Sequence, residues 1–328
     1  MNDLIVSLLP GIKAREKIIL LETPGFEDNL FVQSKRDVEK IINREIKTFW
    51  DISDLQDRAG RIDTTCRMRG IKWISWKNTD YPPLLREMYD PPSVIYFRGK
   101  LPDPEKPLLG IVGTRKPSRE ASEQAYKIAG NIARAGISVV SGLAFGIDSM
   151  AHRGNLAGNA PGFAVLGSGI DEIYPSANRP LAKRILDSGG SLISEYPPGT
   201  APSKWSFPAR NRIISALSRS VLIVEAPEKS GALITAAFAL EQGKDLWVAS
   251  SGAQEGPHDR RGTIKLANDG AEIIYSAVDI LNKWNLTEAE SDNENNVLLY
   301  NAERNGINIK NELISSMADF LKIEIQGQ

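Results

Sequence analysis

Short apolar runs and amphipathic stretches alternate along residues 106–281, and this alternation limits the possible folds more than any other feature of the chain. Each apolar run has the length of a strand and is apolar almost throughout, which is typical of strands buried on both faces. These runs lie at residues 108–113, 137–142, 163–167, 191–195, 221–225 and 246–250. The stretches between them, such as residues 118–135, carry apolar residues at helical spacing. The pattern predicts an α/β fold with a Rossmann-like, doubly wound parallel sheet, whose ligands bind at the carboxyl ends of the strands.

The chain before this core is helical in pattern. Residues 12–21 and 37–50 both carry apolar residues at helical spacing. The Pro10-Gly11 pair between two such segments is typical of a degenerate helix-hairpin-helix, with Lys13 in place of the second glycine. An ordinary helical hairpin explains the same residues equally well.

A polar run at residues 287–296 is typical of a linker. The residues after it are too few to form a core of their own. The chain is therefore expected to contain three regions. They are a small helical domain at 1–70, the α/β core with its lead-in segment at 71–285, and a linker with a short, truncated or degenerate C-terminal segment at 286–328.

Composition excludes several classes of protein. The single cysteine, Cys66, allows neither an intrachain disulfide nor a cysteine zinc cluster. No apolar run approaches the roughly 20 residues of a membrane span, so membrane insertion is not expected. The N-terminus has Asp3 and no basic region, which makes it a poor signal peptide. We therefore expect a cytoplasmic protein. Because the formal net charge is -1, any nucleic-acid binding must come from local basic patches.

The loops after the first three strands combine small residues with positive charge. Gly113-Thr114-Arg115 and the serine at position 118 can present backbone N–H groups and charge to a phosphate, although Ser118 could equally act only as a helix cap. The glycines of Ser141-Gly142 and Gly167-Ser168-Gly169 allow a ligand to approach the backbone closely. These features favour an anionic ligand without identifying it.

The loop after the fourth strand carries the clearest signal. No acidic residue occurs between Glu195 and Glu225, and Trp205 and Phe207 are interleaved with basic residues. The basic residues of this stretch are Lys204, Arg210, Arg212 and Arg219. A solvated loop with buried aromatic residues is the alternative. Because a second acid-free basic loop, residues 106–119, reaches the same edge of the sheet, we favour binding of phosphates and stacked, unpaired bases.

Catalytic and cofactor motifs are scarce. Glu172 stands where a dinucleotide-binding fingerprint has its third glycine, so NAD is not expected. The only histidines are His152, predicted to pack within a helix, and His258. The sequence has no Gly-x-Ser-x-Gly elbow and no Walker A motif. We expect a protein that is not an enzyme and holds neither a cofactor nor a metal.

Several motifs occur in one order along the chain. The set begins with Thr79-Asp-Tyr-Pro-Pro-Leu-Leu-Arg and continues with Gly113-Thr-Arg, Ser141-Gly-Leu-Ala-Phe-Gly-Ile-Asp148, Gly167-Ser-Gly-Ile, Phe207-Pro-Ala-Arg-Asn-Arg-Ile-Ile-Ser-Ala-Leu-Ser218 and Ser230-Gly-Ala-Leu-Ile-Thr-Ala236. This ordered set resembles the DNA-processing protein A family (DprA, also called Smf). The resemblance covers residues 70–281, and residues 1–70 are similar to its sterile-alpha-motif-like domain.

The resemblance implies a single-stranded DNA-binding protein that protects incoming DNA in natural transformation and helps to load the RecA recombinase. It also implies a core that dimerises, and a parallel sheet leaves an edge strand that favours a homodimer. Arg115, Lys204 and Phe207 occupy the positions that line the family's DNA pocket. The predicted DNA-binding residues are Gly113, Thr114, Arg115, Ser141, Gly142, Gly167, Ser168, Gly169, Lys204, Phe207, Arg210 and Asn211. Many members end in a winged-helix domain, and the short segment at residues 286–328 is expected to be a truncated or degenerate remnant of it.

Two other functions are weighed against this one. The lysine-decarboxylase-like (LOG) group cleaves nucleoside monophosphates and needs a Pro-Gly-Gly-x-Gly-Thr-x-x-Glu loop. The corresponding Lys229-Ser-Gly-Ala-Leu-Ile-Thr-Ala236 lacks both the glycine-rich turn and the glutamate. A protein–protein scaffold is the second alternative, and a lack of any DNA binding would favour it.

Overall fold

One mixed sheet forms the centre of the structure, a computed structural model that describes residues 1–26 and 34–286. Nine strands belong to it within these residues, in the order β1-β2-β6-β5-β4-β3-β7-β8-β9. The parallel strands are β3 (Leu108–Val112), β4 (Ser138–Ser141), β5 (Phe163–Leu166), β6 (Ser191–Ser194), β7 (Ser220–Ile223), β8 (Asp245–Ala249) and β9 (Glu272–Ile274). The predicted Rossmann-like α/β class is confirmed, because the chain winds outward in both directions from β3 and β7.

The position of β3 beside β7 fixes where a ligand can bind. Val112 of β3 pairs with Ile223 of β7, while β4 lies on the other side of β3. The order therefore reverses between β3 and β7, and the loops that leave these two strands diverge to opposite faces of the sheet. Such a reversal leaves a crevice at the carboxyl ends of the two strands.

Two antiparallel strands extend the sheet beyond the predicted parallel part. They are β1 (Lys72–Ser75) and β2 (Val94–Gly99), and Tyr96 of β2 pairs with Ser194 of β6. The parallel sheet predicted for the core is present in β3 to β9, and the antiparallel pair at this end was not predicted. The lead-in segment supplies the apolar residues of β2, which pairs with β6 and covers its edge. The short strand β9 was also not predicted.

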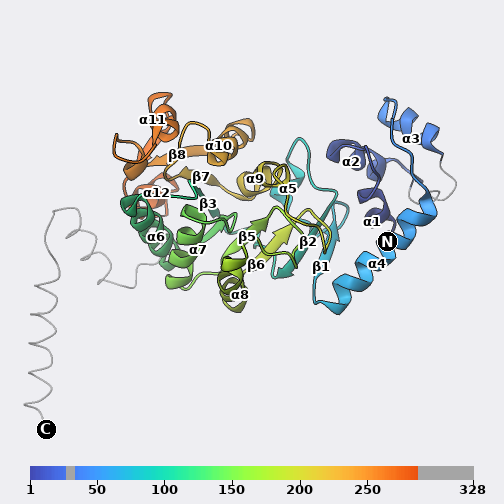
Figure 1. Ribbon diagram of the computed structural model, residues 1–328, viewed down its shortest axis with the longest axis horizontal. Helices are drawn as coiled ribbons and strands as arrows, with labels where there is room; N and C mark the ends of the chain where they lie inside the picture. Colours follow the sequence, from blue (N-terminus) through green and yellow to red (C-terminus); the bar gives the residue numbers. More distant parts are fainter. Residues whose placement is uncertain (27–33, 287–328) are drawn as a thin grey trace, which may run out of the picture. The chain divides into compact units, whose positions relative to one another are not determined.

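Helices cover both faces of the sheet, as Figure 1 shows. There α6 (Arg119–Arg134), α7 (Ile147–Ala157) and α8 (Arg179–Asp187) lie along one side, and α9 (Ser206–Leu217) and α10 (Gly231–Glu241) along the other. The remaining core helices are α5 (Pro83–Arg86), α11 (Arg261–Asn268) and α12 (Ala277–Lys283). Helix α6 begins where the Ser118 hydroxyl accepts a hydrogen bond from the amide of Ala121, and Gly136 follows its end with a φ of 79°.

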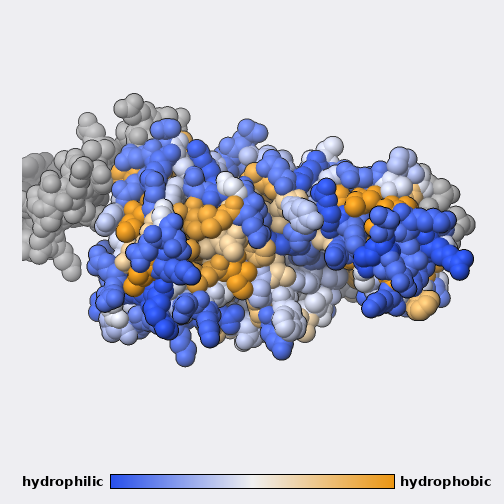
Figure 2. Space-filling view, turned by 90° about the horizontal axis from the view of Figure 1, so that it is seen from above, coloured by the Kyte–Doolittle hydropathy of each residue, from blue (hydrophilic) through white to orange (hydrophobic). Residues whose placement is uncertain are grey.

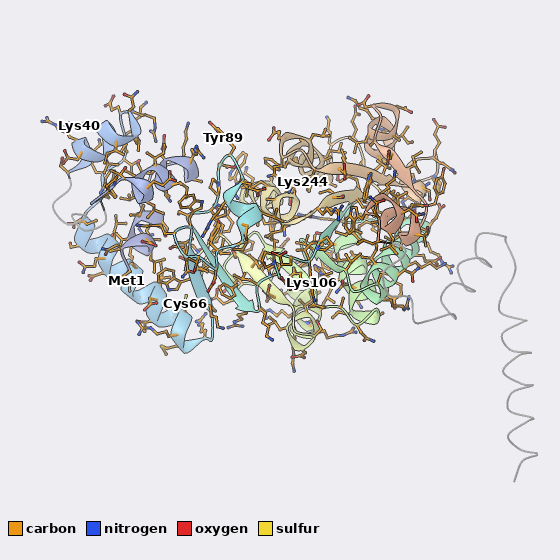
Figure 3. All side chains as sticks on the ribbon, turned by 180° about the vertical axis from the view of Figure 1, so that it is seen from behind. Met1, Lys40, Cys66, Tyr89, Lys106 and Lys244 are labelled. Atoms are coloured by element: carbon orange, nitrogen blue, oxygen red, sulfur yellow. The ribbon has the colours of Figure 1, made fainter. Side chains whose placement is uncertain are left out.

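Among the described residues, four helices precede the sheet, in the region that the sequence predicts to be helical, although the last of them was not predicted as a separate helix. They are α1 (Asn2–Ser7), α2 (Ala14–Glu22), α3 (Lys35–Ile42) and α4 (Ile52–Met68). The helix expected at residues 37–50 ends at Ile42, because Asn43 adopts a left-handed conformation with a φ of 50°. Arg44 then turns back, and its Nε donates to Glu16 at 2.8 Å. Figure 3 shows the single cysteine, Cys66, on α4, where it is buried.

The domain boundaries stay a prediction. The first strand begins at Lys72, close to the expected boundary at residue 70, and residues 1–280 form one compact unit. The expected linker and C-terminal segment lie outside the described residues from position 287 onward. Among residues 1–26 and 34–286, no helix combines the length and the apolar character that crossing a bilayer requires.

Candidate nucleic-acid interface

A cavity of about 750 Å³ opens at the carboxyl ends of β3 and β7. Five segments line it: the loops after β3, β4 and β5, the residues around the start of α9, and the first turns of α10. These segments lie far apart in the sequence, and the reversal of strand order brings them to one place. The cavity therefore occupies the position where this architecture binds its ligands.

Two of the exposed cations in the cavity wall each pack against an aromatic ring. Arg115 Cζ lies 5.5 Å from the centroid of the Phe207 ring, and Lys204 Nζ lies 4.9 Å from the centroid of the Trp205 ring. Both cations remain open to solvent. Such contacts orient long side chains while leaving their N–H groups free to meet an anion.

Aromatic side chains continue from these cations across the mouth of the cavity. The ring centroids of Tyr174 and Phe207 are 5.4 Å apart, with an angle of 40° between the ring planes. Phe207 is half-buried in the first turn of α9, whereas Trp205 is 74% exposed. Flat rings beside exposed cations are the combination that single-stranded nucleic acids use, because bases stack on the rings while phosphates meet the charges.

A buried guanidinium supports the wall from behind. Arg210 Nη1 donates to the carbonyl of Gly142 at 2.7 Å and to that of Val165, and Nε donates to Asn211 Oδ1 at 3.1 Å. Burial lowers the pKa of Arg210 to about 10, and burial raises the pKa of nearby Asp148, whose carboxylate accepts from the amide of Gly142. Arg210 thus ties the ends of β4 and β5 to α9, and little of its charge reaches solvent.

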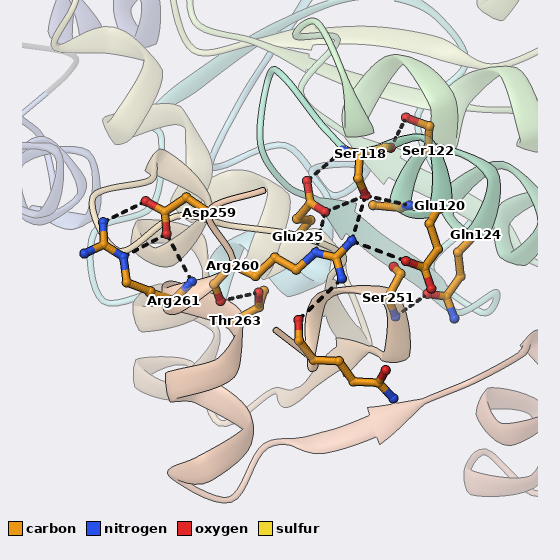
Figure 4. A network of polar contacts seen from close by, with 12 residues as sticks. Ser118, Glu120, Ser122, Gln124, Glu225, Ser251, Asp259, Arg260, Arg261 and Thr263 are labelled. Atoms are coloured by element: carbon orange, nitrogen blue, oxygen red, sulfur yellow. Dashed lines mark hydrogen bonds and ion pairs between the residues drawn. The ribbon is translucent and has the colours of Figure 1, made fainter. Parts of the chain in front are cut away.

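The start of α6 is closed by the chain itself, as Figure 4 shows. Glu225, at the end of β7, accepts hydrogen bonds from the Ser118 amide at 2.8 Å and from the Ser118 hydroxyl at 2.6 Å. Arg260 Nε donates to the same carboxylate at 3.0 Å. Of the two roles open to Ser118, the structure supports the helix cap, because a carboxylate already occupies this helix start. The loop at residues 252–262 supplies the buried Arg260.

Comparison with known proteins agrees with this geometry. Residues 72–285 match the family described as DNA recombination-mediator protein A.

The chain belongs to this family.

Relatives of known name cover most of the core. DNA processing protein DprA of Bacillus subtilis is 40% identical over 231 residues, which are 70% of this chain and 77% of that protein. Protein Smf of Synechocystis is 45% identical over 219 residues, which are 66% of this chain and 54% of that protein. This chain therefore spans only about half the length of the Synechocystis relative.

Solved structures of the family share the fold. The X-ray structure of DprA from Streptococcus pneumoniae aligns with a TM-score of 0.68 at 30% identity and covers 86% of this chain and 95% of its own. A DprA structure from Helicobacter pylori aligns with a TM-score of 0.57 at 29% identity, covering 65% and 95%. The structure of that Helicobacter pylori protein gives insight into a unique mode of single-stranded DNA binding.

Most of the predicted DprA-type site residues meet at the cavity. The seven that line it are Gly113, Thr114, Arg115, Lys204, Phe207, Arg210 and Asn211. Gly142 lines a smaller adjoining cavity that also contacts Phe207 and Tyr174. Ser141, Gly167, Ser168 and Gly169 line neither cavity.

The residues behind the wall have evident structural contacts. The Ser141 hydroxyl donates to the carbonyl of Ile111 at 2.6 Å, and the Ser168 hydroxyl donates to that of Glu172 at 2.6 Å. A Cβ on Gly167 would lie 2.9 Å from the Phe207 ring, so this glycine lets the ring pack closely. A direct contact between these residues and DNA stays a prediction.

Two of the basic residues in the acid-free stretch face elsewhere. Arg212 is buried, and it pairs with Glu195 at 2.6 Å and Asp90 at 3.1 Å. Arg219 precedes β7 and therefore lies at the opposite edge of the sheet. Of the basic residues in this stretch, only Lys204 and Arg210 reach the cavity, because the middle of the stretch forms α9 and its end returns to the amino end of a strand.

Sequence reasoning missed part of the cavity. Tyr174, Lys116, Ser230 and Thr235 also line it, and none was predicted as a site residue. A usable signal existed for Ser230, since a Ser-Gly pair follows a buried strand and opens a helix. Thr235 lies one turn into that helix and carries no such signal.

Proposed function

We propose that this protein binds single-stranded DNA in the cavity between β3 and β7. The observation that carries the proposal is the set of exposed cations, Arg115 and Lys204, beside the rings of Phe207, Tyr174 and Trp205. Cations hold the phosphates and rings hold the bases, with little preference for sequence. The single-stranded DNA binding described for the Helicobacter pylori relative supports the same assignment.

Single strands should be favoured over duplex for a physical reason. A base can stack on Phe207 only if it is unpaired, and Phe207 is half-buried in the cavity wall. An electrophoretic shift with matched single- and double-stranded oligonucleotides tests this. Tighter binding of the single strand is expected, and equal affinity for both would rule out the stacking site.

The wider role proposed here follows from membership of a family of recombination mediators. The protein would protect single strands that enter a cytoplasm during natural transformation and would help RecA to load onto them. Protection is tested by nuclease digestion of an oligonucleotide with and without the protein. Loading is tested by the rate at which RecA covers protein-bound strands, which should rise in its presence.

A homodimer is proposed as the working form. β9 is the parallel edge of the sheet, and apolar side chains are exposed on it and on α10, including Ile273, Ile234 and Leu240. Figure 2 shows an apolar area that is bordered by hydrophilic surface. The two figures share their horizontal axis, and this area lies at the same horizontal place as α10 and β8 in Figure 1. Light scattering at micromolar concentration should give a dimer mass, and a monomer mass would contradict the proposal.

The protein is proposed not to act as an enzyme on nucleotides. The loop before α10 and its first turns, Lys229 to Ala236, hold no carboxylate that could serve as the glutamate of the LOG group. Incubation with AMP or with nucleoside triphosphates should release neither base nor phosphate. Turnover that disappears on replacement of a cavity residue would contradict the proposal.

A further inference from the structure

The hydroxyl of Thr235 is buried in the cavity wall without a hydrogen-bond partner. Its residue is 1% exposed, and within the described chain no group bonds to Oγ1. Several buried side chains of the described residues have a polar atom without a partner, and among these side chains Thr235 is the one that lines the cavity. A buried hydroxyl without a partner destabilises a protein, so a hydroxyl in this position is suited to a ligand that completes its bonding.

The local structure explains why Thr235 has no partner within its own helix. A helical threonine can donate to the carbonyl one turn earlier, which here belongs to Gly231. That carbonyl instead accepts a hydrogen bond from Asn211 Nδ2 at 3.1 Å. The Asn211 side chain thus links α9 to α10, and the Thr235 hydroxyl is left for the cavity.

The start of α10 opens into the same cavity. Ser230, Gly231 and Ala232 line it, and the first turn of this 11-residue helix contains no acidic residue. A Cβ built on Gly231 would meet no atom within 4 Å, so open space lies beside this exposed residue. In this turn the amide of Ala232 donates to the Ser230 hydroxyl at 3.2 Å and that of Leu233 to the Ser230 carbonyl at 3.1 Å. An anion here would therefore meet the partial positive charge of the helix start and share these amides with the serine cap.

We propose that the start of α10, together with the Thr235 hydroxyl, binds a phosphate group of a nucleotide. This site is additional to the phosphate positions assigned to Arg115 and Lys204. The proposal rests on the proposed function where the phosphate is an internal phosphodiester of a bound strand. A free mononucleotide supplies the same group as a terminal phosphate.

The charges around the cavity are compatible with an anion at this point. Arg115, Lys116 and Lys204 are exposed cations in its wall. Asp148 is the acidic residue among those that line it, and its carboxylate is held by the amides of Gly142 and Ala144 on the β4 side. The α10 side of the cavity therefore contributes backbone amides and hydroxyls rather than negative charge.

Thr235→Val tests the proposal, because valine keeps the shape and removes only the hydroxyl. The variant loses no hydrogen bond in the free protein, so its thermal midpoint should equal or exceed that of the parent. Its affinity for a labelled dT oligomer, measured by fluorescence anisotropy, should fall about 10-fold or more, as expected for one hydrogen bond to a charged group. Ser215→Ala is the matched control, since Ser215 also has a buried, unpartnered hydroxyl but does not line the cavity.

The outcomes separate this inference from the proposed function. If the parent binds the oligomer and Thr235→Val binds it equally well, the α10 site is overturned while the strand-binding proposal stands. If the parent binds no oligomer, the strand-binding proposal fails, and dTMP is then compared with thymidine. Binding of dTMP that is lost in Thr235→Val would support the site as one for free mononucleotides. Equal binding of dTMP and thymidine, or no binding of dTMP, would overturn it.

Discussion

Helices α6 and α10 both begin beside the point where the strand order reverses. The start of α6 is occupied by a side chain of the protein, whereas the start of α10 faces a cavity. At α6, the serine cap at position 118 and its amide bind the carboxylate of Glu225, which Arg260 also contacts. At α10, the serine cap at position 230 faces a cavity, and the hydroxyl of Thr235 has no partner in the described residues. The difference indicates that the Glu225 carboxylate makes the start of α6 structural, while the start of α10, which has no such carboxylate, is open to a ligand.

Burying a carboxylate at the start of α6 costs free energy, and the start of α10 has no such cost. A buried carboxylate must be neutralised and hydrogen-bonded, and Glu225 needs both Ser118 and a cation from a loop 35 residues further along. The α6 region is therefore expected to affect stability, while the α10 side of the cavity is expected to affect binding. The predictions below test that division, starting with the largest effect.

Arg260→Ala should destabilise the protein most. Removal of Arg260 leaves the buried Glu225 carboxylate without its cation, which typically costs about 3–5 kcal/mol. The free energy of unfolding from urea titration measures the loss. The affinity for single-stranded DNA, corrected for the folded fraction, should stay at the parent value.

Arg261→Ala is the matched control for that change. Arg261 is adjacent in sequence, but it is exposed and pairs with Asp259 at the surface, as Figure 4 shows. Its loss should leave stability nearly unchanged. If both variants unfolded alike, or if Arg260→Ala lost DNA binding while folded, the closed helix start would not be purely structural.

Phe207→Ala should lower affinity by about 1–3 kcal/mol, or roughly 5- to 150-fold, through loss of one stacked base. The dependence of affinity on salt should stay unchanged, because phenylalanine carries no charge. Since Phe207 is half-buried, Phe207→Leu serves as a companion that keeps apolar packing but removes the ring. Stacking would be contradicted if both variants kept full affinity, or if the alanine variant lost it only by unfolding.

Lys204→Ala should have the smallest effect. It should weaken binding modestly and should reduce the slope of log affinity against log salt by about 0.7, the amount for one phosphate on a single strand. Lys106→Ala removes the same charge before β3, at the opposite edge of the sheet, and should leave the slope unaltered. Equal slopes for the two variants would mean that Lys204 contacts no phosphate.

Much of the core was predictable because strands buried on both faces leave a plain pattern. The apolar run at residues 108–113 became β3 at Leu108–Val112, and the carboxyl-edge loops that it predicts do meet at one cavity. The antiparallel pair β1 and β2 was missed because its pairing with β6 depends on contacts distant in sequence. The helix expected at 37–50 stopped at Ile42 because one asparagine could adopt a left-handed turn.

The division between the two helix starts could not be predicted from the sequence. Ser118 and Ser230 both precede a helix that follows a buried strand, and both act as caps. Only folding brings Glu225, which is 107 residues from Ser118, to the first of them. The same holds for Thr235, whose free hydroxyl depends on the Asn211 side chain from another helix. Local patterns therefore identify helix starts, and tertiary contacts decide which of them are open.

Photo-crosslinking of an oligomer that contains 4-thiothymidine tests most directly whether the cavity beside α10 is where a single strand binds. After irradiation and digestion, mass spectrometry identifies the crosslinked residues. We expect crosslinks at Phe207, Tyr174 or Trp205, which are lost when unlabelled single-stranded DNA competes but kept when duplex competes. Crosslinks confined to the helices before β1, or to the Arg260 loop, would contradict this expectation.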